Sequence, residues 1–227
     1  MAVLETHFYH KTIHFYTGVF GTIFNNMKVK NGNRMVSVPI QYAGQDKMNV
    51  AKDRDDNRAN VRFKQRLPKL TYVLRGWNRD DSRMKNRQFK MYERPVNGTE
   101  AKFQYNRIPY NFTYELRAKT KHLDDLLQIC EQIMAYFNPN LQVIVDDNPD
   151  LPFENTINIT MTDSSMEDQF EGLYEDGRTL EAVFNFTLEG YIYLPTMDSK
   201  VINQVKINYH QIIDPDNILI DQQEIPD

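Results

Sequence analysis

Three histidines near the start of the chain have the spacing closest to that of a metal site. His7, His10 and His14 are separated by three and four residues, which would place their imidazoles on one face of a helix. Such a trio can bind zinc or another transition metal. No acidic residue lies where it would supply a fourth ligand, because Glu5 falls on another side. The pattern therefore favours an exposed face near a helix start, and no metal or cofactor is predicted.

The acidic stretches are also weak candidates for chemistry. Residues 146–150 are similar to a calcium loop, but Leu151 stands where glycine is needed and Ile157 where the bidentate glutamate is needed. A turn is the better interpretation, and the acids at 163–178 are predicted to form a solvated loop. The one cysteine, Cys130, excludes an intramolecular disulfide, and no nucleophile elbow or phosphate-binding loop occurs. The sequence predicts a protein that is not an enzyme.

The charge of the chain is strongly polarised. Residues 52–94 carry fourteen Lys and Arg against six Asp and Glu, giving +8, whereas residues 146–227 carry three against eighteen, giving −15. Opposite charges separated along one chain favour surfaces that meet charged partners, including other copies of the chain, although a solvated loop is the plainer alternative. The candidate interface residues are Arg54, Arg58, Arg62, Lys64, Arg66, Arg79, Arg83, Lys85, Arg87 and Lys90.

The same basic segment raises a nucleic-acid hypothesis. Aromatic residues such as Tyr72, Trp77 and Phe89 lie among the cations, and this combination serves phosphate contact and base stacking. Six interleaved acids, the overall charge of −4 and the lack of a known binding module argue against sequence-specific recognition. Weak contact with a passing DNA backbone is more plausible.

The amino-terminal half contains elements that would position these residues. Apolar residues recur at helical spacing from Lys11 to Met27, which predicts a largely buried helix or one shared with a partner. Alternation over 36–42 predicts a strand, and Pro39 indicates an edge or a bulge. A further strand is expected at 70–75, whereas 43–66 and 76–109 are expected to be basic and irregular.

The second half predicts one helix among several strands. Alternation from Tyr110 to Ala118 is the clearest strand pattern. A helix is predicted from Leu123 to Phe137, with Thr120 as a candidate cap and a buried stripe at positions 123, 126, 127, 130, 134 and 137. Further strands are expected at 141–145, 157–161, 182–194 and 201–209.

Together these elements predict an α+β fold, with a largely antiparallel or mixed β-sheet, an N-terminal helix, a central helix at about 122–137 and long charged loops. We expect one domain over 1–213, with basic insertions at 43–66 and 76–109, followed by an acidic tail at 214–227. No transmembrane helix and no export signal is expected, so the chain should stay in the compartment where it is made.

Four blocks of the sequence resemble a known family in order and spacing. They are FYHKTIHFYTGVFGTIFNNMKVK at 8–30, VPIQYAGQDK at 38–47, LPKLTYVL at 67–74 and, most specifically, YELRAKTKHLDDLLQICEQIMAYFNPNL at 114–141. In these blocks the chain resembles the tail sheath stabilizer and completion proteins, the tail terminators of T4-like contractile-tailed bacteriophages. The resemblance extends from about residue 8 to residue 210.

The resemblance implies a structural virion protein without catalytic residues. Members of that family form a hexameric ring that caps the tail tube and the head-proximal end of the sheath, and the ring offers a docking surface to the neck. The implied partners are further copies of the chain, sheath and tube subunits, and neck or connector proteins, with genomic DNA passing through the lumen without specific binding. The implied location is the virion tail, assembled in the host bacterial cytoplasm. The alternatives are a head–tail neck or adaptor protein and a nucleic-acid-binding protein using 52–94.

Overall fold

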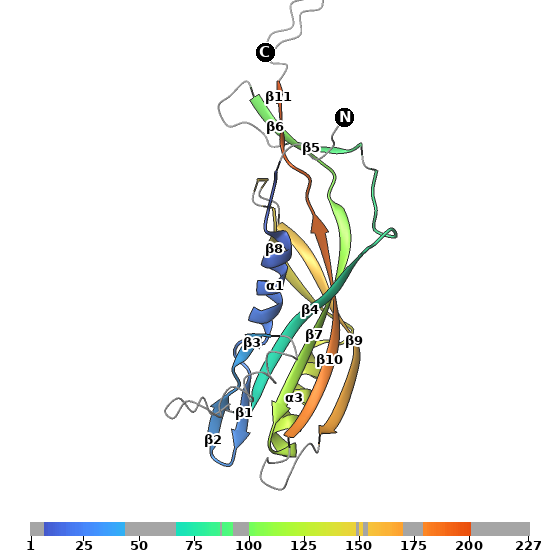
Figure 1. The fold of residues 1–227 in the computed structure, drawn as a ribbon. Coiled ribbons are helices and arrows are strands. Elements are labelled where there is room, and N and C mark those ends of the chain that lie inside the picture. Colours follow the sequence, from blue (N-terminus) through green and yellow to red (C-terminus); the bar gives the residue numbers. More distant parts are fainter. Residues whose placement is uncertain are drawn as a thin grey trace, which may run out of the picture.

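The computed structural model describes residues 7–43, 67–86, 88–92, 100–148, 150–151, 154–169 and 179–200. Its main feature is a six-stranded sheet in the order β3-β4-β7-β10-β9-β8. The strands are β3 (Ile40–Tyr42), β4 (Lys69–Arg79), β7 (Ile108–Thr120), β10 (Thr179–Ile192), β9 (Glu154–Gln169) and β8 (Asn140–Asp146). β3 runs parallel to β4, and the other neighbouring strands pair antiparallel. Figure 1 shows the long central strands crossing the molecule side by side.

In the described part of the chain, two helices cover one face of this sheet. They are α1 (Thr12–Ile23) and α3 (Leu123–Tyr136). The ring of Phe186 on β10 lies 5.4 Å from Phe20 of α1 and 4.8 Å from Phe137 at the end of α3, measured between ring centroids. Since one side chain meets both helices, they pack on the same side. This arrangement confirms the predicted α+β fold with a mixed sheet and two helices.

The core forms because alternate residues of the central strands are large and apolar. On β7, Phe112, Tyr114 and Leu116 are fully buried, and Phe184 and Phe186 of β10 are buried beside them. Phe20 stacks on Tyr114 with ring centroids 4.5 Å apart, so helix α1 is held against the sheet by aromatic packing. Burial of these rings is the main source of stability for this layer.

The opposite face of the sheet carries a chain of charged side chains. Arg75 donates two hydrogen bonds to Glu115, at 2.8 and 2.7 Å. Arg117 contacts Glu115 and also donates to the fully buried Glu181 at 2.7 Å. Lys119 Nζ lies 3.0 Å from the second oxygen of Glu181. Charges therefore alternate across neighbouring strands and satisfy one another.

Smaller elements lie at the two ends of the sheet. The hairpin of β1 (Lys28–Asn31) and β2 (Arg34–Ser37) is at one end, where Lys30 exchanges backbone hydrogen bonds with the side chain of Gln128 on α3. A three-stranded sheet in the order β11-β6-β5 lies at the other end (Figure 1). Its strands are β5 (Lys90–Tyr92), β6 (Glu100–Tyr105) and β11 (Met197–Lys200).

Several boundaries differ from the sequence predictions. The N-terminal helix is shorter than 11–27, and the strand expected at 36–42 is divided at Pro39 into β2 and β3. β3 is an edge strand of the large sheet, as the proline indicated. The segment 76–109, expected to be irregular, contains the end of β4 and strands β5 and β6. The strand predicted at 201–209 lies outside the described residues.

Two predictions in the second half are wrong for physical reasons. The acidic loop expected to begin at residue 163 does not begin there, because β9 continues along β10 through Gln169. Thr120 does not cap α3: it is the last residue of β7, and its hydroxyl donates to the carbonyl of His122, which occupies the N-cap position itself. No helix in the described part of the chain is long and apolar enough to span a membrane.

Candidate functional site

Four of the predicted interface residues lie in the described part of the chain, between the end of β4 and the start of β5. They are Arg79, Arg83, Lys85 and Lys90. The other six predicted residues, Arg54, Arg58, Arg62, Lys64, Arg66 and Arg87, lie outside the described residues. Only four of the ten predicted interface residues can therefore be placed in the fold.

Two of these arginines are engaged within the chain. The Nε of Arg79 donates to Asp81 at 2.6 Å, and both side chains are more than half exposed. The Nε of Arg83 donates to Asp80 at 2.7 Å, and its guanidinium also reaches Asn111 at 2.7 Å. The hydrogen bonds from Arg83 and from Ser82 hold the pKa of Asp80 well below its usual range. Arg83 is thus a structural residue of this turn, whereas Arg79 has a weak surface pair.

The two lysines face different surroundings. Lys90 Nζ lies 4.4 Å from the ring centroid of Phe103 and 5.6 Å from that of Tyr105, which is a cation–π arrangement. Lys85 is exposed and lines a pocket of about 600 Å³. This volume is in the range typical of binding sites in proteins.

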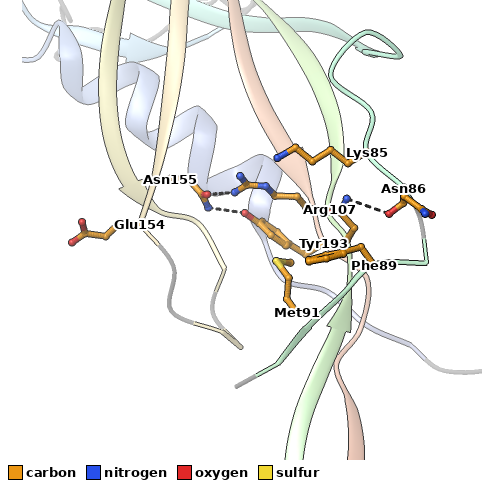
Figure 2. A pocket seen from close by; sticks show the side chains of 9 residues that line it. Lys85, Asn86, Phe89, Met91, Arg107, Glu154, Asn155 and Tyr193 are labelled. Atoms are coloured by element: carbon orange, nitrogen blue, oxygen red, sulfur yellow. Dashed lines mark hydrogen bonds between the residues drawn. The ribbon is translucent and has the colours of Figure 1, made fainter. Parts of the chain in front are cut away.

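The pocket is formed by segments that are distant in the sequence. Lys85, Phe89 and Met91 come from the β4–β5 connection and β5, and Arg107 comes from the short β6–β7 connection. Asn155 comes from β9, and Tyr193 from the segment after β10. In Figure 2, Lys85 and Arg107 lie along one side of the pocket, and Tyr193, Phe89 and Met91 along the other. The carboxylate of Glu154 points away from the two cations (Figure 2). The pocket therefore combines positive charge with aromatic and apolar surface.

A buried carboxylate lies behind the pocket wall. Asp147 is 3% exposed, and its oxygens accept hydrogen bonds from the hydroxyl of Tyr16, from the hydroxyl of Tyr193 at 2.7 Å and from the amide of Asn155 at 2.5 Å. Burial raises the pKa of both tyrosines far above its ordinary value, and the adjacent carboxylate adds to the effect. Both phenols are therefore protonated donors at neutral pH. We call Tyr16, Asp147, Asn155 and Tyr193 the Asp147 cluster.

Arg107 connects this cluster to the basic surface. It donates to the side-chain oxygen of Asn155, and its guanidinium lies 3.9 Å from the ring centroid of Tyr191. Arg83 lies 5.4 Å from the same ring, so Tyr191 is contacted by two guanidinium groups. The backbone N–H of Tyr191 donates to the hydroxyl of Tyr16 at 2.9 Å. The pocket, the Arg83 turn and helix α1 are thereby fixed relative to one another.

The Asp147 cluster was missed in the sequence, where 146–150 was interpreted as a turn. Its members are separated by 131, 46 and 8 residues from Asp147, so no local spacing indicates it. One usable indication existed: Tyr16 lies on the buried face of a predicted helix, and a buried phenol needs a hydrogen-bond partner.

The histidine trio does not form one helical face. Helix α1 begins at Thr12, so His7 and His10 precede it and only His14 is helical. His10 Nδ1 instead lies 3.5 Å from the carboxylate of Asp150. Among the residues that the structure describes, no group of three His, Cys, Asp or Glu side chains is placed to hold a metal ion.

Comparison with known proteins establishes the class. The family of T4-like virus Myoviridae tail sheath stabilisers matches residues 7–226. Because the match covers nearly the whole chain, the protein belongs to this family: it is a structural component of a contractile phage tail, a tail-completion protein rather than an enzyme.

A curated relative in this class is the tail completion protein gp15 of Enterobacteria phage T4. The two sequences are 25% identical over 215 residues, which cover 90% of this chain and 79% of the T4 protein. The resemblance seen in the four sequence blocks is thereby confirmed, and the neck-adaptor and nucleic-acid-binding alternatives are set aside.

Proposed function

We propose that the protein closes the head-proximal end of the tail as a homo-oligomeric ring, with six copies as the expected number. In this position it caps the tail tube and sheath and offers a docking surface to neck or connector proteins. The observation that carries the proposal is the family match over residues 7–226. Genomic DNA would pass through the lumen of the ring without specific binding.

The charge distribution supports assembly into a ring. In a cyclic oligomer, each subunit meets its neighbours through two different surfaces. The segment at 52–94 carries a net charge of +8 and the segment at 146–227 a net charge of −15, and the exposed charges of the two segments would pair between neighbouring subunits. Such complementarity speeds association and fixes its register. Arg79 and Lys85 are the exposed members of the basic segment in the described residues that best fit this role, and Lys90 at the start of β5 is also exposed.

The remaining interface residues are part of the same proposal. Arg54, Arg58, Arg62, Lys64, Arg66 and Arg87 would extend the basic surface toward a neighbouring copy or toward sheath and neck subunits. The domain division is likewise a proposal: one α+β domain over 1–213 that carries the basic insertions 43–66 and 76–109, and an acidic segment at 214–227 that serves assembly.

The decisive experiment has two parts. First, the mass of the purified protein is measured by light scattering at low and high salt, and a species near six times 26.9 kDa is expected. Second, the protein is added to purified tails that lack it, and electron microscopy should show a cap at one end. A protein that stays monomeric and leaves both tail ends uncapped would contradict the proposal.

A further inference from the structure

The pocket has a chemistry suited to a particular kind of peptide. Lys85 and Arg107 provide positive charge on one side, and Phe89 and Met91 provide apolar surface on the other (Figure 2). Phe89 is 65% exposed, although an aromatic ring of this size is normally better covered. An occupant with a carboxylate next to aliphatic side chains would pair with the cations and cover Phe89 at the same time.

The last fourteen residues of the chain have this composition. Residues 214–227, DPDNILIDQQEIPD, contain five acidic residues and no Lys or Arg. Three aliphatic residues in succession, Ile218 to Ile220, are followed directly by Asp221. The segment therefore has both features that the pocket would recognise, arranged next to each other.

The direction of β11 favours a neighbouring copy as the source of this segment. β11 pairs antiparallel with β6, with Met197 opposite Phe103 and Lys200 opposite Glu100. The pocket residue Arg107 lies just beyond the other end of β6, so the chain moves away from its own pocket as it approaches Lys200. The 27 residues after Lys200 can span up to roughly 90 Å when extended. That length is sufficient to reach another subunit.

We infer that the pocket is the receptor for the acidic carboxyl-terminal segment, residues 214–227, of a neighbouring copy of the chain. The inference rests on the proposed ring and adds to it the site on one subunit and the segment supplied by the next. Lys85 and Arg107 meet the carboxylates, and the aliphatic residues at 218–220 cover Phe89 and Met91. Each subunit would bind one neighbour and be bound by the other, which closes the ring.

Disulfide trapping in the full-length protein tests this contact. Cys130 is the only native cysteine and is 8% exposed, so introduced thiols react with little interference. One copy carries Phe89→Cys and a second, distinguishable by a tag, carries Ile220→Cys. Mixing them under mild oxidation should give a disulfide-linked heterodimer. The matched control replaces Phe89→Cys by Met35→Cys, which is 64% exposed on β2 at the opposite end of the molecule.

The expected result is a several-fold higher heterodimer yield with Phe89→Cys than with Met35→Cys, and a loss of this preference at high salt. Adding Lys85→Glu to the Phe89→Cys copy should lower the yield, whereas Lys30→Glu on exposed strand β1 should not. Equal yields for the two cysteine positions would overturn the inference. So would a double variant, Phe89→Cys with Ile220→Cys, that links within one chain while the mixture gives no heterodimer.

A failure of this inference can be distinguished from a failure of the proposed ring. If the wild-type protein has the hexameric mass and no preferential link forms, the ring stands and the carboxyl-terminal segment does not hold it at this pocket. If the link forms preferentially in a protein that is otherwise monomeric, the contact is real, and the ring closes only on the tail.

Discussion

At the scale of single residues, Asp147 is the side chain whose replacement should lower the stability of the fold most clearly. Replacing it with alanine would leave the hydroxyls of Tyr16 and Tyr193 and the amide of Asn155 without their common acceptor. Each buried donor left unpaired costs about 1–3 kcal/mol. We expect Asp147→Ala to lower the free energy of unfolding by about 3 kcal/mol, measured by urea denaturation.

The neighbouring residue provides the control. Asp146 is exposed at the end of β8, and Asp146→Ala should change the unfolding free energy by less than about 0.5 kcal/mol. If Asp147→Ala lowered the unfolding free energy as little as Asp146→Ala, the Asp147 cluster would not stabilise the fold.

Glu115 makes the stability of the fold depend on pH in the acidic range. Burial alone would raise the pKa of its carboxyl, but hydrogen bonds from Arg75 and Arg117 outweigh burial and lower the pKa below the ordinary 4.5. Its contribution to stability is therefore complete above pH 4.5 and is lost as the pH falls toward the folded-state value. The stability difference between wild type and Glu115→Gln should shrink as the pH decreases from 7 to 3.

The comparison for this prediction is Glu131→Gln, an exposed position on α3. That substitution should leave the pH dependence close to that of the wild type. A wild-type curve that runs parallel to that of Glu115→Gln through the acidic range would contradict the role assigned to the arginine contacts.

At the scale of elements, helix α3 shows what periodicity can and cannot predict. The helix was predicted almost to the residue, but the stripe was assigned partly to the wrong face. Leu123, Leu127 and Met134 are about half exposed, whereas Ile129 and Ile133 are buried. A helix rich in apolar residues offers two overlapping stripes, and packing against β7, β10 and β1 selects one of them.

Two adjacent residues test this orientation. Ile133→Ala should lower the unfolding free energy by about 3 kcal/mol, because the side chain is 1% exposed and its loss leaves a cavity. Met134→Ala, at 46% exposed, should cost less than about 1 kcal/mol. Denaturant unfolding of both variants measures the difference. A larger loss of unfolding free energy for Met134→Ala than for Ile133→Ala would mean that the buried face of α3 is the one predicted from the sequence.

Other elements were predicted to different degrees. Alternation identified β7 because Tyr110, Phe112 and Tyr114 face the core between polar residues. It failed for the end of β9, where strand pairing with β10 holds residues such as Asp163 that have little strand preference. The pocket was not predicted: of its lining residues Lys85 was named, as a candidate interface residue, whereas Arg107, Asn155 and Tyr193 reach the pocket through the sheet topology rather than through local sequence.

At the scale of the whole molecule, assembly and folding respond to different arginines. Arg79→Glu combined with Lys85→Glu reverses exposed charges and should weaken ring formation while leaving the unfolding free energy nearly unchanged. Arg83→Glu should instead destabilise the subunit, because it places a carboxylate against Asp80 and removes the contact with Asn111.

Light scattering at low salt and urea unfolding separate these two effects. If the wild type assembles only on tails, tail capping replaces the mass measurement. Wild-type assembly by the Arg79→Glu, Lys85→Glu variant would show that this part of the basic surface is not at an interface.

The strand order also determines how much of the chain must be synthesised before the large sheet can form. β10 is the last strand of the large sheet to be synthesised, yet it lies between β7 and β9. Until the ribosome has released residue 192, the chain can form only two half-sheets, β3-β4-β7 and β8-β9, each with a long open edge where β10 will insert. Open edges of this kind invite pairing with other nascent chains. A chain truncated before Thr179 should therefore aggregate rather than persist as a smaller folded subunit, and incomplete translation products would be kept out of the ring.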